Sequence, residues 1–199
     1  MSEAERILLH RQLHEAVAAT IRLCRIEADV SQDQAAYRLK WPRSLYIARE
    51  SGSLRTSVAE FILIASVLMQ NPVRMLAQVL LQYSLISSGQ ITARPPPVAR
   101  RQGRIRGFVP PSGAPLRKAA STTTKRKLHG FHVATAIAIR ACRLQADLNQ
   151  TELGTQLGLS RRGIGGLEGS ARVPVSLFIL IAPAVNLTPE ELLTEVLRA

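Results

Sequence analysis

The sequence has few of the residues that build catalytic and metal centres. It contains two cysteines and four histidines among 199 residues, which excludes a disulfide framework and leaves no cluster with the ligand spacing of a zinc site. Paired carboxylates, a nucleophile with a neighbouring base and a glycine-rich phosphate loop are all missing. We therefore predict that the protein is not an enzyme and holds no metal ion or cofactor.

Long hydrophobic runs are also missing. The longest apolar stretches, such as residues 61–69, fall well short of the roughly 20 residues that a membrane-spanning helix requires. The N-terminus is amphipathic and charged, unlike a secretory signal peptide. Cys24 and Cys142 lie on apolar helical faces and suit small buried thiols in a reducing compartment. These features predict a cytoplasmic protein without a membrane partner.

Acidic residues are absent from the middle of the chain. The protein carries a net charge of +12, with 26 Lys and Arg against 14 Asp and Glu. Residues 84–127 hold ten basic and no acidic groups, whereas residues 128–199 hold six of each sign. Such a concentrated positive segment attracts polyanions, nucleic acid in the first place and an acidic membrane surface in the second.

An internal duplication is the main feature that the sequence does contain. Residues 22–32 read RLCRIEADVSQ and residues 140–150 read RACRLQADLNQ, while residues 52–65 read GSLRTSVAEFILIA and residues 169–182 read GSARVPVSLFILIA. The offset is 118 in the first pair and 117 in the second, so repeat one has an additional residue between its two blocks. Two copies at so long a period indicate duplicated domains rather than a solenoid, which needs more copies.

The apolar spacing predicts helices only, because hydrophobic residues recur every three or four positions and no segment alternates convincingly. In repeat two, Asn149 and Ser160 are placed to cap helices and Gly158 to end one. Thr188, followed by Pro189 and Glu191, has the pattern of a capping box. The helices expected in repeat two span 128–146, 150–157, 161–168 and 175–185, with a fifth that begins at 189.

Repeat one follows the same plan, with Ser31 and Asn71 capping its second and fifth helices. We therefore predict an all-α chain of two five-helix domains, residues 1–86 and 128–199. The intervening segment, 87–127, is basic and rich in Pro, Gly and Ser, so we expect a disordered linker. As a flexible coil of about 40 residues it would average roughly 35 Å end to end. This span is close to one turn of DNA, about 34 Å.

Several residues of repeat two form a connected pattern: Arg143, Asn149-Gln150, Leu153-Gly154, Leu157 to Ser160, Ile164, Leu167-Glu168, Arg172 and Pro174. With this pattern, and with the string GLSRRGIGGLE, repeat two resembles the helix-turn-helix domain of the lambda-repressor/Cro, or XRE, family. The likeness covers 133–198 and extends more weakly over 16–83 of repeat one. It implies that the third helix of each repeat, the recognition helix, enters the major groove of DNA. It also implies that Arg143 and Glu168 tie the first helix to the end of the third.

The resemblance implies a set of DNA contacts in each repeat. Arginines at the front of a recognition helix can reach guanine edges or phosphates. The glycines of the repeat-two helix let its backbone approach another surface, although each weakens the helix by about 1 kcal/mol relative to alanine. In repeat two the expected contact residues are Gln150, Ser160, Arg161, Arg162, Gly165, Gly166 and Arg172. In repeat one they are Gln32, Arg43, Ser44, Ile47 and Arg55.

Repeat one departs from the family pattern in its third helix. Tyr46 and Arg49 fall where repeat two has Ile164 and Leu167, so an arginine faces a core position. Either this helix is rotated or the core beneath it is more open. Because the helix still begins with a basic residue, we expect it to contact DNA. Binding of a protein through the same face is the other interpretation.

The linker contains arginines spaced by small residues, a pattern similar to arms that enter the minor groove of DNA. A solvated charge run that binds nothing in particular explains the same pattern. The arginines concerned are Arg100, Arg101, Arg104 and Arg106.

Two segments carry more apolar residues than one small domain can bury. The N-terminal helix begins early, and the fifth helix of repeat one continues through Leu81, Leu85 and Ile86. Such a surplus suggests a homodimer or a protein partner such as RNA polymerase. The alternative is that the two extensions pack on each other.

Taken as a whole, the residues predict a sequence-specific, nucleoid-associated transcription regulator that places two helix-turn-helix domains on adjacent half-sites of double-stranded DNA. One alternative is a protein-binding regulator, of the antiactivator or antitoxin kind, with only repeat two on DNA. Another is a non-specific architectural DNA binder driven by the linker. The glycines of the repeat-two helix favour sequence specificity, whereas the charge distribution suits the architectural interpretation equally well.

Overall fold

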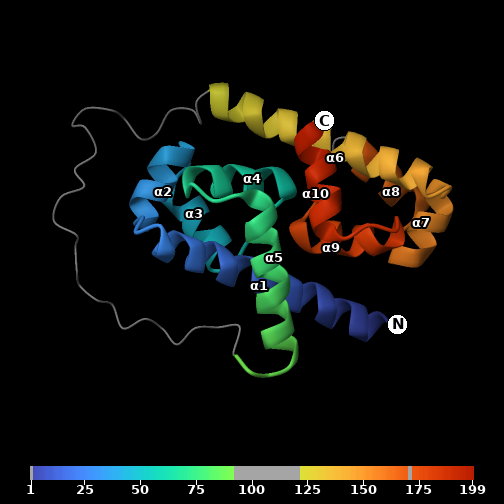
Figure 1. Ribbon diagram of the computed structural model, residues 1–199, viewed down its shortest axis with the longest axis horizontal. Coiled ribbons are helices and arrows are strands. Elements are labelled where there is room, and N and C mark those ends of the chain that lie inside the picture. Colours follow the sequence, from blue (N-terminus) through green and yellow to red (C-terminus); the bar gives the residue numbers. More distant parts are fainter. Residues whose placement is uncertain (1, 92–121, 170–171) are drawn as a thin grey trace.

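The computed structural model describes residues 2–91, 122–169 and 172–199. In these ranges the regular elements are helices, two sets of five in the same order, which confirms the predicted all-α class (Figure 1). No single helix in them has both the length and the apolar character to cross a membrane. The first set is α1 (Glu3–Glu27), α2 (Gln32–Leu39), α3 (Arg43–Glu50), α4 (Val58–Val67) and α5 (Pro72–Ser87). The second is α6 (Thr122–Gln145), α7 (Gln150–Leu157), α8 (Arg161–Glu168), α9 (Val175–Ala184) and α10 (Pro189–Arg198).

Several helices begin at a side-chain cap or end at a left-handed residue, at positions that the sequence predicts. Gly158 ends α7 in the left-handed conformation, with φ of 66°. Its counterpart Lys40 ends α2 with φ of 57°, so repeat one keeps the left-handed turn without a glycine. That conformation is unfavourable for a residue with a Cβ atom. The predicted residues that cap a helix by accepting backbone hydrogen bonds are Ser31, Asn71, Asn149, Ser160 and Thr188.

The first helix of repeat two begins earlier than the sequence predicts. α6 starts at Thr122 rather than at 128, so the predicted linker of 87–127 loses its last residues to a helix. Lys and Arg are good helix formers, and neither Pro nor Gly interrupts residues 122–129. The four linker arginines that were expected to contact DNA, Arg100, Arg101, Arg104 and Arg106, lie outside the described residues.

The two repeats pack directly against each other. α1 lies against α9, α6 lies against α4, and α5 meets α10. Because α1, α4 and α5 are the counterparts of α6, α9 and α10, each contact recurs with the repeats exchanged, as at the interface of a symmetric dimer. In Figure 1, α1 and α6 run along opposite edges of the molecule, and the pairs α2–α3 and α7–α8 lie toward opposite ends of its long axis.

An isolated antiparallel bridge marks the centre of this interface. It joins Ser57 to Pro174, which are equivalent residues by the repeat offset of 117. Their neighbours exchange two backbone hydrogen bonds, from Val58 N to Val173 O at 2.9 Å and from Val175 N to Thr56 O at 3.0 Å. Since the two bonds interchange under the same offset, a pseudo-twofold axis passes between Ser57 and Pro174.

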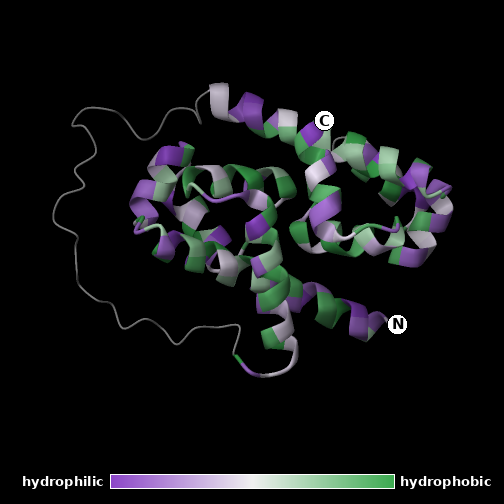
Figure 2. Ribbon diagram, in the orientation of Figure 1, coloured by the Kyte–Doolittle hydropathy of each residue, from purple (hydrophilic) through white to green (hydrophobic). Residues whose placement is uncertain are grey.

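Most of the buried apolar residues of both repeats belong to one hydrophobic cluster, which extends from Leu13 in α1 to Val196 in α10. Figure 2 shows apolar residues concentrated where the helices meet, above all along α4 and α9. The interface therefore fixes the separation of the repeats. This finding corrects the expectation that the span of a flexible linker determines that separation.

The apolar extensions of repeat one cover each other. α1 and α5 pack along one another, which buries Ile86 and half-buries Leu85, whereas Leu81 is 58% exposed. The Ile86 side chain belongs to the core, so among the three residues predicted to meet a partner only Leu81 is largely exposed. Cys24 and Cys142 are buried free thiols, as predicted.

Candidate nucleic-acid interface

The turn between α7 and α8 is too tight for side chains at two positions. Leu159 N donates to Gly154 O at 2.7 Å, and a Cβ atom on Gly154 would lie only 2.6 Å from Leu159 O. Position 154 therefore requires a glycine, because the Leu159 carbonyl leaves no room for a side chain there. Gly158 has a positive φ and lies beneath the Arg6 guanidinium, which a Cβ atom would have to displace. The early part of α1 thus reaches this turn in the other repeat.

α8 buries one face and exposes the other. Ile164 is fully buried and Leu167 is 9% exposed, as the sequence predicts. Ser160 is exposed and accepts a hydrogen bond of 3.1 Å from Gly163 N at the start of the helix. Arg161 and Arg162 are exposed, and neither side chain forms an ion pair within the described residues. Two free cations thus lie at the front of this helix.

Nothing in the fold requires the three glycines of α8. None has a positive φ. A Cβ atom on Gly163 would meet nothing closer than 3.5 Å, one on Gly165 nothing closer than 3.9 Å, and one on Gly166 nothing within 4 Å. Each nevertheless weakens the helix by about 1 kcal/mol relative to alanine. A helix with such residues on an open face is suited to the very close approach of another molecule.

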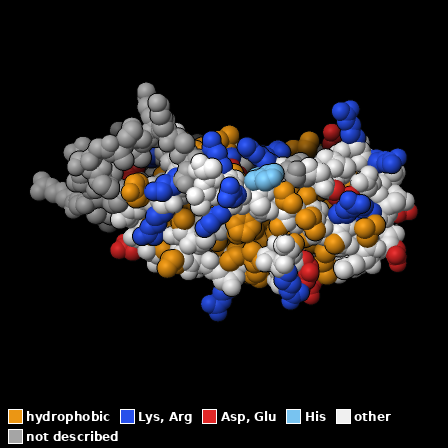
Figure 3. Space-filling view, turned by 90° about the horizontal axis from the view of Figure 1, so that it is seen from above, with side chains coloured by type: hydrophobic (Ala, Val, Ile, Leu, Met, Phe, Trp, Pro, Cys, Tyr) orange, Lys and Arg blue, Asp and Glu red, His pale blue; other side chains and the backbone are white. Residues whose placement is uncertain are grey.

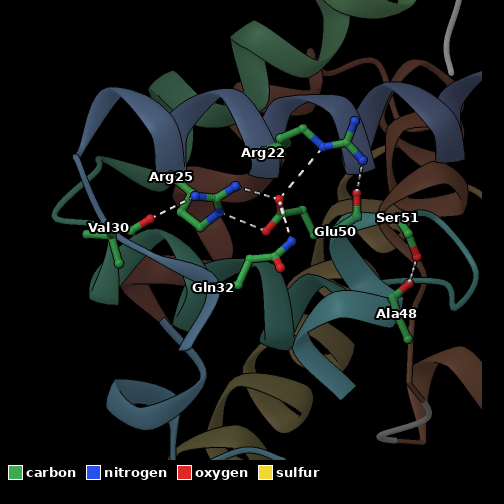
Figure 4. Close-up of polar contacts among 7 residues, drawn as sticks. All are labelled: Arg22, Arg25, Val30, Gln32, Ala48, Glu50 and Ser51. Carbon is green, nitrogen blue, oxygen red and sulfur yellow. Dashed lines mark hydrogen bonds and ion pairs between the residues drawn. The ribbon is translucent and has the colours of Figure 1, made fainter. Parts of the chain in front are cut away.

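A polar network holds the end of the third helix in repeat one (Figure 4). Arg25 donates two hydrogen bonds of 2.9 Å to the Glu50 carboxylate and one of 2.8 Å to Val30 O. Gln32 Nε2 donates to the same carboxylate at 3.2 Å. Arg22 approaches the carboxylate at 3.7 Å. These contacts fix α3 against α1 and α2.

Repeat two has the same network. Arg143 donates to both carboxylate oxygens of Glu168, at 2.5 and 3.1 Å, which confirms the predicted pair. Gln150 Nε2 adds a hydrogen bond to Glu168 at 2.8 Å. Burial opposes ionisation of Glu168, but the hydrogen bonds from Arg143 and Gln150 outweigh it and hold the pKa of this carboxyl below its usual value. The predicted DNA contacts of Gln32 and Gln150 would have to use their remaining amide atoms.

A buried ion pair lies beneath α3. Tyr46 is fully buried and Arg49 is 8% exposed. Arg49 donates hydrogen bonds of 2.7 Å to Glu60 in α4 and to Arg55 O. The expectation of a rotated helix or an open core is wrong, because a carboxylate from the next helix compensates the arginine in place.

The exposed face of α3 differs from that of α8. Arg43 and Ser44 are exposed and Ile47 is half-buried. The Arg43 guanidinium forms an ion pair with Asp33 of α2, so its charge is partly compensated. The two predicted recognition helices therefore present different chemistry: an arginine beside an acid in repeat one, and two free arginines with bare backbone in repeat two.

Arg55 and Arg172, the last two predicted contact residues, lie beside the pseudo-twofold axis. They are equivalent by the offset of 117, both are exposed, and together they line a cavity of about 460 Å³. The same axis relates α3 to α8, which lie toward opposite ends of the long axis of the molecule (Figure 1). The structure thus brings the contact residues of both repeats into one symmetric arrangement.

The start of α6 adds basic residues that the sequence analysis assigned to the linker. Lys125, Arg126 and Lys127 are exposed on this helix. Seen from above, the molecule shows Lys and Arg side chains interspersed with hydrophobic ones, and Asp and Glu mostly toward the edges (Figure 3). A helix could have been predicted here, because residues 122–129 contain neither Pro nor Gly.

Comparison with known proteins identifies no relative. No family model matches the chain, and neither a curated protein nor a solved structure matches it. Any functional inference therefore depends on the residues and geometry of this chain.

Proposed function

We propose that the protein is a sequence-specific DNA-binding transcription regulator in which the two repeats act as linked helix-turn-helix units of the lambda-repressor kind. The open glycine face of α8 carries the proposal, because the fold does not require it and it follows two unpaired arginines. In this proposal α8 enters the major groove, where Arg161 and Arg162 meet guanine edges or phosphates. Gly163, Gly165 and Gly166 let its backbone approach the base pairs.

The docking of the repeats supports binding to two half-sites. Two recognition helices that are related by a twofold axis match the two half-sites of a bipartite operator on one face of the duplex. Because α3 and α8 present different side chains, the two half-sites differ in sequence. We therefore expect an asymmetric operator whose half-site spacing follows from the interface between the repeats.

Alanine substitution of the three glycines tests the proposal. The preferred DNA sequence is first selected from a random duplex library with the full chain, and affinity is then measured by fluorescence anisotropy. The variant G163A/G165A/G166A should be more stable, by up to about 1 kcal/mol for each site. It should nevertheless bind the selected sequence more weakly, because three methyl groups would stand between backbone and DNA.

Gly130 provides the matched control. It lies in α6, and an added Cβ atom would meet nothing within 4 Å. The G130A variant should therefore gain stability without any change in DNA binding. Undiminished affinity of the triple variant for the selected sequence would contradict the proposal.

A second candidate function has only repeat two on DNA, while repeat one binds a protein. The exposed Asp33 carboxylate beside Arg43 favours it, since an acidic group near the front of α3 opposes contact with phosphates. Selection would then yield a single half-site, and the variant R43A/S44A would bind it as tightly as the wild type. A selection without any sequence preference would instead favour the architectural alternative.

A further inference from the structure

A cavity at the pseudo-twofold axis lies apart from the exposed faces of α3 and α8. Its volume of about 460 Å³ falls within the roughly 300–1,000 Å³ that is typical of small-molecule sites. Both repeats contribute to it, so one bound molecule would touch both. Repeat one contributes Arg49, Arg55, Ser57 and Glu60, and repeat two contributes Arg172 and Pro174.

The cavity carries an excess of positive charge. Arg49, Arg55 and Arg172 bring three guanidinium groups, and Glu60 brings the single carboxylate. This carboxylate is already engaged, since it accepts hydrogen bonds from Arg49 at 2.7 Å and from the Ser57 N–H and hydroxyl at 2.9 and 3.0 Å. Arg55 and Arg172 have no acidic partner within the described residues. Two uncompensated cations, one from each repeat, therefore face the cavity.

Arg49 adds a buried donor that is not used. Its side chain is 10% exposed, and its two terminal nitrogens donate to Glu60 and to Arg55 O. The buried Nε has no hydrogen-bond partner among the residues that the structure describes. A buried donor without an acceptor is unfavourable, and this donor belongs to a side chain that lines the cavity.

The surrounding histidines are consistent with a strongly positive site. Burial lowers the pKa of His14, and the charges of Arg55 and Arg49 lower it further. In repeat two, burial and the charge of Arg172 lower the pKa of His132. Both imidazoles therefore stay neutral more readily than a free histidine, and the positive charge remains on the arginines.

We infer that this cavity binds a small phosphate-type oxyanion, such as inorganic phosphate, pyrophosphate or a phosphomonoester, between Arg55 and Arg172. The planar forks of guanidinium groups match the oxygens of such an anion in pairs of parallel hydrogen bonds. Because the anion joins an arginine from each repeat, it strengthens the docking of the repeats. This inference does not depend on the proposed function, since the site is complete without DNA.

Isothermal titration calorimetry of the full chain with sodium pyrophosphate and with sodium phosphate, in chloride buffer without DNA, tests the inference. One saturable site per chain is the expected result. The variant R55Q/R172Q should bind at least about tenfold more weakly, because it loses charge-assisted hydrogen bonds on both sides. Its far-UV circular dichroism should match that of the wild type, because both substituted side chains are exposed.

The variant R74Q/R140Q is the matched control, since it removes one exposed arginine from each repeat outside the cavity. It should keep the wild-type affinity for the anion. An equal loss in both variants would show an effect of net charge alone and would overturn the inference.

A wild-type chain that binds neither anion would also overturn the inference. If R55Q/R172Q then weakened binding to a DNA duplex, the arginines would serve backbone phosphates of DNA and no free anion. Thermal melting adds an independent check, because phosphate also stabilises proteins non-specifically. A specific site predicts a larger upward shift of the melting temperature in the wild type and in R74Q/R140Q than in R55Q/R172Q.

Discussion

Arg49 and Glu60 form a buried ion pair at positions where the second repeat has two leucines. The Arg49 Nη2 atom lies 2.7 Å from Glu60 Oε1, and the two side chains are 10% and 7% exposed. The repeat offsets place Leu167 and Leu177 at the same two positions. The same contact between the third and fourth helices is therefore made by an ion pair in repeat one and by two apolar residues in repeat two.

The charged pair should be less costly to replace as a whole than one charge at a time. Replacing both charges, in R49L/E60L, removes the desolvation of two ions, but it also leaves the Ser57 N–H and hydroxyl without their Glu60 acceptor, so we expect a modest loss of stability. Replacing Arg49 alone should cost about 3–5 kcal/mol, because it leaves the Glu60 charge buried without its partner. Urea unfolding of the single and double variants measures both effects. A single variant as stable as the double variant would show that the two charges are not coupled.

The left-handed residues after the second helices predict effects of opposite sign. Gly158→Ala should destabilise the protein by roughly 1–2 kcal/mol from backbone strain, and further because the Arg6 side chain must move. Lys40→Gly should stabilise it, since Lys40 has a φ of 57°. Thermal unfolding of both variants, with G158A/R6A to separate the contact from the strain, checks this. Full recovery in G158A/R6A would contradict the contribution of strain.

Stability should fall as the pH falls below about 6.5, the usual histidine pKa. Burial, with help from neighbouring arginines, lowers the pKa of His10, His14 and His132 in the folded protein. Above that pH the histidines are neutral in both states and contribute nothing. Below it the unfolded chain binds protons more readily than the folded one, which favours unfolding.

Urea unfolding between pH 7.5 and 5.5 measures this dependence. In the double variant H14Q/H132Q, which removes two equivalent histidines, the free energy of unfolding should change less over this range. A dependence as steep as that of the wild type would assign the effect to other groups.

Repeat two alone should not behave as an independent folded monomer. Residues 122–199 would expose the faces of α6, α9 and α10 that repeat one covers. Because these faces are apolar, the fragment should either pair with a second copy through the same interface or lose helical structure. Light scattering coupled to size-exclusion chromatography, with circular dichroism, measures both. A stable monomer with full helicity would show that the interface contributes little to folding.

Local structure could be predicted from the sequence because local chemistry determines it. Ser31, Asn149 and Thr188 cap helices through their own side chains and the residues next to them. The pairing of Arg143 with Glu168 followed from a resemblance that includes both residues. The residues that form each cap lie in one short segment, and the two residues of the ion pair belong to one motif.

The docking of the repeats could not be predicted in the same way. The surplus apolar residues in α1 and α5 show only that their surface must be covered. A second copy of the chain or a partner protein could cover it as well as the other repeat does. The partner of Arg49 was also missed, although the aligned repeats contained its signal. Both Leu167 and Leu177 change to charged residues of opposite sign in repeat one, and such a paired change indicates contact.

The bridge between Ser57 and Pro174 joins two parts of the same chain, and this sets how the protein responds to its own abundance. Regulators that assemble from separate chains lose the active form on dilution, so their occupancy of DNA rises steeply with expression. If the protein binds DNA as proposed, dilution cannot separate its two halves, and its occupancy of DNA, while low, would rise in simple proportion to the number of chains. A substitution in one half is also not copied into the other, so the exposed faces of α3 and α8 are free to diverge.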